Sequence, residues 1–328
     1  MFKKILIYGE NWIGTLPQLL ASDLSRRGYS IEIFDFTEIL PGIRNRSIRE
    51  RIQRRLFEKL YTARIRMLFL KKVEDFRPDL VLVAKGLHLD KPTLTEIRSK
   101  GIPLVNWNPD DFFNLKNSNA SLIEAMSAYD LIVSSRDHLF EKYRDHGAQH
   151  LLYLDWYYVP ELHFDRTMEK TITASFVGSW SPTREEFIAE LTTPLRIWGG
   201  GWEKSSKSFH KFHAVQNKIL SQVEMSTVFC SSKFNLNLLT HENSDFSNLR
   251  FFEVPASGGL LLTERNPTAK RYLVDKEECL MFSSPEEINK IIGGDFKIDN
   301  IACAGKLRIT TGGNAFSNRV DELLANLK

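Results

Sequence analysis

Cysteine is scarce in this 328-residue sequence, and long apolar runs are missing from it. The three cysteines, Cys230, Cys279 and Cys303, have no paired spacing and no histidine cluster nearby, so we expect neither a disulfide framework nor a zinc site. No apolar run reaches the length of about 18 residues that a transmembrane helix needs. The apolar run near the N-terminus stops at Gly9, and a run of this length is too short for a signal peptide. We therefore expect a buried strand there and a cytoplasmic protein.

Neither sign of charge dominates, since 44 Lys and Arg oppose 41 Asp and Glu, but the cations gather in one segment. Between residues 44 and 72 only Glu50 and Glu58 oppose them. The cations there are Arg44, Arg46, Arg49, Arg51, Arg54, Arg55, Lys59, Arg64, Arg66, Lys71 and Lys72. One interpretation is the solvated face of a long helix. The other is a surface for anionic lipid headgroups or for an anionic acceptor, and the apolar residues beside the cations favour it. Those apolar residues are Ile48, Ile52, Leu56, Leu60 and Tyr61. Aromatic residues do not alternate with the cations, so nucleic acid is not an expected partner.

Short apolar segments alternate with helical patterns along most of the chain. Strands are predicted at 4–8, 30–35, 79–84, 103–107 and 130–134, and again at 172–177, 195–198, 234–239, 260–263 and 279–282. Helices are predicted at 16–27, 91–100, 121–128, 182–192, 215–225 and 315–326, with a long basic helix in the 44–72 segment and a further helix from residue 248. This alternation predicts an α/β protein with two Rossmann-like domains, residues 1–160 and 161–310, whose parallel sheets face a central cleft. A C-terminal helix within 311–328 is expected to pack back across the domain junction.

The first strand leads into a loop with two glycines, at the edge of the sheet where such folds bind ligands. Gly9, Asn11 and Gly14 belong to this loop, and a helix N-terminus follows it, which favours an anion. The spacing is neither the dinucleotide fingerprint nor a phosphate-cradling loop with its lysine. The loop therefore predicts an acceptor or phosphate contact, and a structural turn explains it equally well.

The second half has an equivalent turn in Phe-Val-Gly-Ser-Trp-Ser-Pro-Thr-Arg. Gly178 and Ser179 follow the strand, and Arg184 offers a planar cation to a diphosphate. Alternatively, Ser181 only caps the helix and Arg184 pairs with a nearby glutamate.

A polar segment after the strand at 234–239 carries the richest set of side chains. Arg250 and Glu253 lie three residues apart, on one face of a predicted helix. Ser247 and Asn248 stand at its N-terminus, where a phosphate would be favoured, and Gly258 belongs to the Gly-Gly pair at its end. Glu253 could accept hydrogen bonds from two ribose hydroxyls. The alternative is a surface ion pair between Arg250 and Glu253.

The sequence resembles the CgeB-like (spore maturation protein) glycosyltransferase family and, more broadly, the C-terminal domain of GT-B glycosyltransferases. The resemblance rests on the Phe-Val-Gly-Ser turn, on Ile-Trp-Gly-Gly-Gly-Trp, on Asn-Leu-Arg-Phe-Phe-Glu-Val-Pro-Ala-Ser-Gly-Gly, and on Cys279-Leu-Met-Phe-Ser-Ser-Pro-Glu-Glu-Ile. It implies that Glu253 contacts the donor ribose, and that Arg250 and Arg184 lie near the diphosphate. Retaining enzymes of this class often carry a second glutamate seven residues before the ribose-binding one. This chain has Phe246 at that position, beside Asp245.

Three side chains of the first half are candidates for the general base. Asp110 and Asp111 follow the fourth strand, and His88 follows the third. The alternative for the aspartates is a turn in which a carboxylate caps the next element. His210 and His213 flank a lysine in a polar stretch and are expected to be solvated.

These patterns together predict a glycosyltransferase that uses a nucleotide sugar, UDP- or GDP-linked, with no cofactor and no obligatory metal. The resemblance favours retention over inversion. The expected acceptor is a cell-surface polysaccharide, a glycolipid or another glycan, and the basic segment suits a peripheral position at the inner face of the membrane. Two alternatives stay open: a nucleotide-sugar epimerase of the same fold, and a non-catalytic protein that binds nucleotide sugars or glycans.

Overall fold

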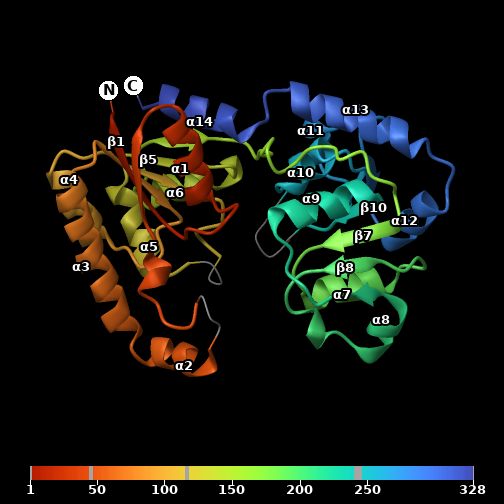
Figure 1. Cartoon of the computed structure of the whole chain (residues 1–328), viewed down its shortest axis with the longest axis horizontal. Helices are drawn as coiled ribbons and strands as arrows, with labels where there is room; N and C mark the ends of the chain where they lie inside the picture. The colour runs from red at the N-terminus through yellow and green to blue at the C-terminus, as the bar shows by residue number, and fades with distance from the viewer. Residues whose placement is uncertain (1, 44–46, 115–117, 240–245, 328) are drawn as a thin grey trace. The chain divides into compact units, whose positions relative to one another are not determined.

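The chain consists of two compact units. The computed structural model describes residues 2–43, 47–114, 118–239 and 246–327 (Figure 1). Unit 1 comprises Met1–Asp155 and Val320–Lys328, and unit 2 comprises Trp156–Arg319. Unit 2 therefore begins shortly before the boundary at residue 160 that the sequence suggests, and the end of the chain returns to unit 1.

Unit 1 is built on a six-stranded parallel sheet with the order β2-β1-β3-β4-β5-β6. Its strands are β1 (Lys4–Tyr8), β2 (Ser30–Phe34), β3 (Leu80–Ala84), β4 (Leu104–Trp107), β5 (Leu131–Ser134) and β6 (Leu151–Tyr153). In the register of the sheet, Ile5 of β1 faces Ile31 on one side and Leu80 on the other. All five residues of β3 are buried, as expected for a parallel strand with both faces covered.

Helices surround this sheet. They are α1 (Leu16–Arg26), α2 (Ile48–Leu56), α3 (Glu58–Phe76), α4 (Lys91–Ser99), α5 (Ala120–Ala125) and α6 (Phe140–Asp145), with 3-10 turns η1 (Phe36–Glu38), η2 (Met126–Ala128) and η3 (Asp137–Leu139). Helix α3 packs against β1, β2 and α4 (Figure 1) and buries Ile65, Phe69 and Val73. The predicted long basic helix is thus two helices, separated at Phe57. No residue of α2 is buried. Arg44 and Arg46 lie outside the described residues.

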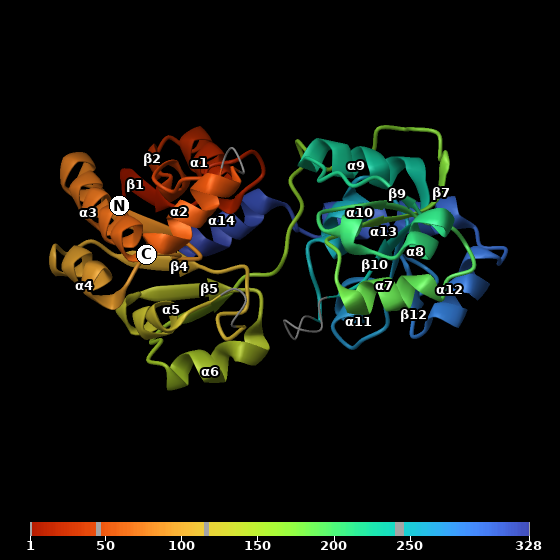
Figure 2. The same ribbon diagram turned by 90° about the horizontal axis from the view of Figure 1, so that it is seen from below.

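Unit 2 repeats the plan with a second six-stranded parallel sheet, in the order β12-β11-β10-β7-β8-β9. Its strands are β7 (Ile172–Val177), β8 (Arg196–Trp198), β9 (Ala214–Val215), β10 (Ser232–Asn237), β11 (Leu261–Glu264) and β12 (Leu280–Phe282). Its helices are α7 (Pro182–Ala189), α8 (Lys207–Phe212), α9 (Gln222–Ser231), α10 (Arg250–Ala256), α11 (Ala269–Tyr272), α12 (Pro285–Ile292) and α13 (Ile298–Thr311), with the 3-10 turn η4 (Trp202–Lys204). Helix α10 packs against α9 and α13 (Figure 2). Helix α14 (Phe316–Ala325) begins in unit 2 and ends in unit 1.

All ten predicted strands are present, with ends that differ by no more than two residues. The predicted helix at 215–225 is wrong, because Val215 ends strand β9 and the helix begins only at Gln222. Ser221 forms a capping box with Glu224 there, and this local signal fixes the helix start. Within the described residues, no helix combines the length and the apolar character needed to cross a bilayer.

Candidate functional site

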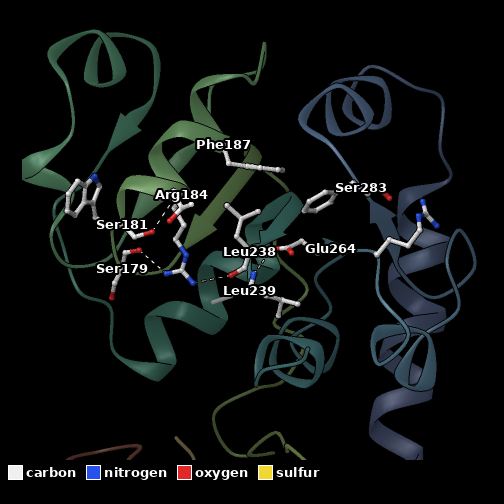
Figure 3. A pocket seen from close by; sticks show the side chains of 12 residues that line it. Ser179, Ser181, Arg184, Phe187, Leu238, Leu239, Glu264 and Ser283 are labelled. Carbon is white, nitrogen blue, oxygen red and sulfur yellow. Dashed lines mark hydrogen bonds between the residues drawn. The ribbon is translucent and has the colours of Figure 1, made fainter. Parts of the chain in front are cut away.

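A pocket of about 760 Å³ lies at the carboxyl ends of four strands of unit 2 (Figure 3). Strands β7, β10, β11 and β12 end beside it, and this is the edge where parallel α/β sheets bind ligands. Its lining residues are Ser179, Trp180, Ser181, Thr183, Arg184, Phe187, Leu238, Leu239, Glu264, Arg265, Phe282 and Ser283. The pocket therefore combines hydroxyl groups, aromatic rings and two guanidinium groups within the volume range of small-molecule sites, about 300–1,000 Å³.

One wall of this pocket is the turn between β7 and α7. Ser181 caps the helix and accepts the amide N–H of Arg184 at 3.3 Å, with Pro182 at the first helical position. The Arg184 guanidinium donates to the carbonyl oxygens of Ser179 (2.9 Å) and Leu238 (3.1 Å), as Figure 3 shows. Arg184 therefore ties the ends of β7 and β10 together. The predicted cap at Ser181 is confirmed, and Arg184 is held on the pocket wall by backbone carbonyl groups.

The opposite wall contains Glu264 and Arg265, which the sequence patterns did not single out. Glu264 accepts the amide N–H of Leu239 at 2.7 Å. Arg265 forms ion pairs with Asp275 and, at 2.9 Å, with Glu287, and these carboxylates raise its pKa. The one available signal was position, because Glu264 ends an apolar strand and Arg265 follows it at the ligand-binding edge of the sheet. Neither belongs to a motif.

Arg250 and Glu253 form the predicted ion pair, but this pair is not a surface feature. Glu253 is only 1% exposed, and its second oxygen lies 3.8 Å from Nε2 of His163. Burial lowers the pKa of His163, although the Glu253 carboxylate opposes this shift. Arg250 also reaches the carbonyl oxygen of Val177, at the end of β7, at 3.5 Å. The pair therefore lies beside the end of β7, and neither residue lines the pocket beside Arg184.

Asn248 supports the end of β10, whereas Ser247 contacts Trp156, outside the sheet. Ser247 accepts a hydrogen bond from the Trp156 indole at 3.0 Å, and Asn248 donates to Asn237 of β10 at 2.9 Å. Asp245 lies outside the described residues. Phe246 is about half exposed, with 48% of its surface accessible.

Gly258 lies away from this group of residues. It precedes β11, at the amino-terminal edge of the sheet, and lines a separate pocket of about 350 Å³ near Asp165. Its φ of +78° favours glycine, and an added Cβ would come within 2.7 Å of the Asp165 carboxyl carbon. The structure thus explains Gly258 by backbone conformation and close approach, and does not bring it to the pocket beside Arg184.

The glycine loop of unit 1 is organised largely by its own hydrogen bonds. The amide of Gly9 donates to the carbonyl of Phe34 at 3.2 Å, and the amide of Gly14 donates to the Gln18 side chain at 3.3 Å. The Thr15 hydroxyl closes the turn by contacts with the carbonyls of residues 10 and 12, each at 2.8 Å. Asn11 is exposed. These contacts fit the structural-turn alternative, because two amides that could meet a phosphate already have partners.

The three candidate bases occupy different surroundings. Asp110 follows β4 and forms an ion pair with Lys85, which follows β3, at 2.7 Å. Asp111 is 7% exposed and accepts the amide N–H of Phe113 at 2.7 Å, so it makes the turn that the alternative interpretation describes. His88 lines another pocket of unit 1, beside α2, and burial lowers its pKa. The residues that line the His88 pocket include neither aspartate.

The expectation that His213 is solvated is wrong. His213 is 3% exposed, and its Nδ1 accepts the amide N–H of Leu195 at 3.1 Å. Burial lowers its pKa to about 4. His210 is exposed, with Nε2 3.0 Å from the Ser205 hydroxyl. The described part of the chain contains no group of three or more His, Cys, Asp or Glu side chains placed to hold a metal ion.

Known proteins resemble the chain at two levels. Residues 183–325 match the model of a family described as glycosyl transferase-like. Sucrose-phosphate synthase from Thermosynechococcus elongatus is similar in structure, with a TM-score of 0.71 at 10% identity over 99% of each chain. HepE of Anabaena in complex with UDP-glucose has a TM-score of 0.63 at 10% identity, covering 100% of this chain and 99% of that one. UDP-GlcNAc 2-epimerase from Neisseria meningitidis, bound to UDP-GlcNAc, has a TM-score of 0.54 at 12% identity over 99% of each chain. A search of the curated protein sequences found no match.

The two six-stranded parallel sheets and their helices, together with these neighbours, define a GT-B fold. Within that fold, most of the matched family segment lies in unit 2, which contains the pocket beside Arg184. The predicted fold class is thereby confirmed.

Proposed function

We propose that the protein is a glycosyltransferase, of the CgeB-like type, that takes a sugar from a nucleoside-diphosphate donor bound in the pocket beside Arg184. The observation that carries this proposal is the position and lining of that pocket. It opens at the carboxyl ends of β7, β10, β11 and β12 and falls largely within the segment that matches the glycosyl transferase-like family. The complexes of HepE with UDP and with UDP-glucose support a donor of this class.

In this proposal charged and apolar side chains of the pocket bind different parts of the donor. The guanidinium groups of Arg184 and Arg265 attract the diphosphate, and the partly buried ring of Phe187 lies where a base can stack. Ser179 belongs to the same wall and offers its hydroxyl to a phosphate oxygen. The departing diphosphate is then stabilised by fixed cations, so no obligatory metal ion or cofactor is invoked.

We extend the proposed donor site to Arg250 and Glu253, which do not line this pocket but lie beside it, with Arg250 at the end of β7. Nε of Arg250 is buried and has no hydrogen-bond partner among the described residues. Buried donors normally have partners, and a diphosphate oxygen would supply one. We propose that Glu253 also contacts the donor ribose, as the resemblance implies, with its carboxylate shared between Arg250 and the ribose. We propose that Asp110, in preference to Asp111, contacts the acceptor hydroxyl, because the Asp111 carboxylate already closes a turn. In a retaining transfer the departing diphosphate takes the proton of that hydroxyl, so Asp110 orients the hydroxyl and is not its base.

The acceptor in this proposal is a glycan or a lipid-linked glycan, and transfer retains the anomeric configuration. The test is incubation with a panel of nucleotide sugars in the presence and absence of glycan and glycolipid acceptors, with release of the nucleoside diphosphate as the readout. Acceptor-dependent release of one nucleoside diphosphate is the expected result, and NMR of the product gives its configuration.

The same assay separates the alternatives, which the similarity to 2-epimerases keeps relevant. Conversion of the donor sugar without any acceptor would show an epimerase. Binding of a nucleotide sugar without turnover, over a broad acceptor panel, would show a binding protein. Either outcome would overturn the proposed transfer.

A further inference from the structure

Unit 1 contains a pocket of about 570 Å³ that the donor site does not use. Helix α2 forms one side of it, and His88, four residues beyond strand β3, lies on another. The apolar side chains that line it include Ile48 and Ile52, which are 67% and 57% exposed. The pocket therefore lies at the carboxyl-end edge of the unit 1 sheet, where this class of sheet binds ligands.

The charged side chains that line this pocket are mostly positive. Arg51, Arg54 and Arg55 line it, and Glu58 is the acidic residue among the lining groups. Across residues 47–114 and the other described ranges, none of these three arginines takes part in an ion pair. Arg66, by contrast, pairs with Asp90 at 2.6 Å. Like charges three and four residues apart destabilise a helix, so α2 would be stabilised by an anion.

His88 is held rigidly at the same pocket. Its φ of +67° is unusual for a residue with a side chain, and its carbonyl accepts a hydrogen bond from Nε of Arg66 at 3.0 Å. Nδ1 lies 3.3 Å from the Thr62 hydroxyl, and the ring packs edge-on against Phe36. Burial and the nearby cations Arg54 and Arg66 lower the pKa of His88, against the opposing effect of Glu58. The imidazole is therefore a positioned neutral group beside the cations.

We infer that this pocket binds a phosphate group of the acceptor, with Arg51, Arg54 and Arg55 on the phosphate and the apolar side chains of α2 against the rest of the molecule. Guanidinium forks match phosphate oxygens, and three of them without carboxylate partners favour a multiply charged anion over a neutral glycan. The assignment of this phosphate to the acceptor rests on the proposed function, whereas the proposal that the pocket binds an anion does not. The phosphate has two possible sources, a free sugar phosphate or the headgroup of a lipid.

The test measures binding without any sugar donor. The probes are inorganic phosphate and vesicles of equimolar phosphatidylcholine and phosphatidylglycerol, with pure phosphatidylcholine vesicles as the blank. The proteins are the wild type, Arg54→Gln/Arg55→Gln, and the control Arg49→Gln, which removes one cation from the same helix outside the pocket. Arg184→Ala is included because phosphate could also enter the donor pocket.

The wild type and the Arg184→Ala variant should bind at least one anionic probe, and Arg54→Gln/Arg55→Gln should bind it at least about 10-fold more weakly. The control should stay close to the wild type. Binding of phosphate points to a soluble acceptor, and binding of the anionic vesicles alone points to a lipid headgroup. The inference is overturned if neither probe binds, if the control loses as much affinity as the double variant, or if Arg184→Ala removes the binding. A failure of the donor assay with this binding intact would refute the proposed function alone.

Discussion

Glu253 shows what a single carboxylate contributes when it is buried beside one guanidinium group. It is 1% exposed and pairs with Arg250, so its loss would leave Arg250 without a carboxylate partner among the described residues. We expect Glu253→Gln to lower the free energy of unfolding by about 3 kcal/mol, since breaking a buried pair from one side is costly. Urea denaturation followed by tryptophan fluorescence measures this, because four of the six tryptophans belong to unit 2.

The matched control for Glu253→Gln is Lys218→Gln, which breaks an exposed pair with Glu224 and leaves the capping carboxylate in place. Exposed pairs contribute little to stability, so this control should unfold nearly as the wild type does. Equal effects of the two substitutions would show that the buried pair has no structural importance.

His213 should make the stability of unit 2 depend on pH. Its folded-state pKa of about 4 is below the value of about 6.5 in an unfolded chain, so below pH 6.5 the unfolded state binds the proton more readily. Stability is then lost as the pH falls from about 6.5 toward 4. The free energy of unfolding should be about 2 kcal/mol lower at pH 5 than at pH 7.

The comparison for His213 is His213→Gln, whose side chain does not titrate. Urea denaturation at pH 7 and pH 5 should show a smaller loss of stability in this variant, because His163 and His88, with lowered pKa values, remain. An equal loss in both proteins would contradict the assignment to His213.

At the scale of elements, the ends of β7 and β8 approach each other so closely that one glycine is required. Gly199 has a φ of +144°, and an added Cβ would lie 2.0 Å from the carbonyl oxygen of Gly178. Gly199→Ala should therefore push the Gly178–Ser179 turn out of place, lowering the melting temperature and the affinity for a nucleoside diphosphate together. Thermal unfolding and calorimetric titration measure the two effects.

Gly313→Ala is the control that separates the backbone strain at a positive φ from displacement of the Gly178–Ser179 turn. Gly313 also has a positive φ, +69°, but its added Cβ would meet nothing within 4 Å. Its substitution should cost only the conformational strain, about 1 kcal/mol, and leave nucleotide binding unchanged. If Gly199→Ala behaves in the same way, the close approach at the pocket wall has no functional consequence.

The elements themselves were largely predictable from the sequence. Buried parallel strands such as Leu80–Ala84 are continuous apolar runs between turns, and the Ser181-Pro182 pair marks the start of α7. Short elements such as β9, with two residues, carry no periodicity and were missed. The site was predictable only in part, because Arg184 follows a strand-turn-helix signal, whereas Glu264 was marked only by its position at the end of a strand. Burial of Glu253 depends on packing with His163, 90 positions earlier in the chain, which no local pattern reveals.

At the scale of the whole molecule, the chain completes unit 1 with its last residues. Val320 and Leu323 are fully buried, and Asp321 forms an ion pair with Arg27. Deleting residues 320–328 should destabilise unit 1 by about 4 kcal/mol, from the two lost apolar side chains. Hydrogen exchange should show faster exchange of the β1 and β3 amides, with the amides of β7 and β10 unchanged. Asp321→Ala, which keeps both apolar side chains, is the control and should change little.

The proposed role of the whole molecule depends most directly on whether unit 2 binds a nucleoside diphosphate. The measurement is a thermal-shift panel of UDP, GDP, ADP, CMP and dTDP on the wild type and on Arg184→Ala. A ligand at about 100 times its dissociation constant adds about 2.7 kcal/mol of stability, which a melting curve resolves. We predict that one nucleoside diphosphate raises the melting temperature of the wild type and that Arg184→Ala removes most of this rise. No shift with any of the five, or a shift that Arg184→Ala leaves unchanged, would contradict a donor site in this pocket.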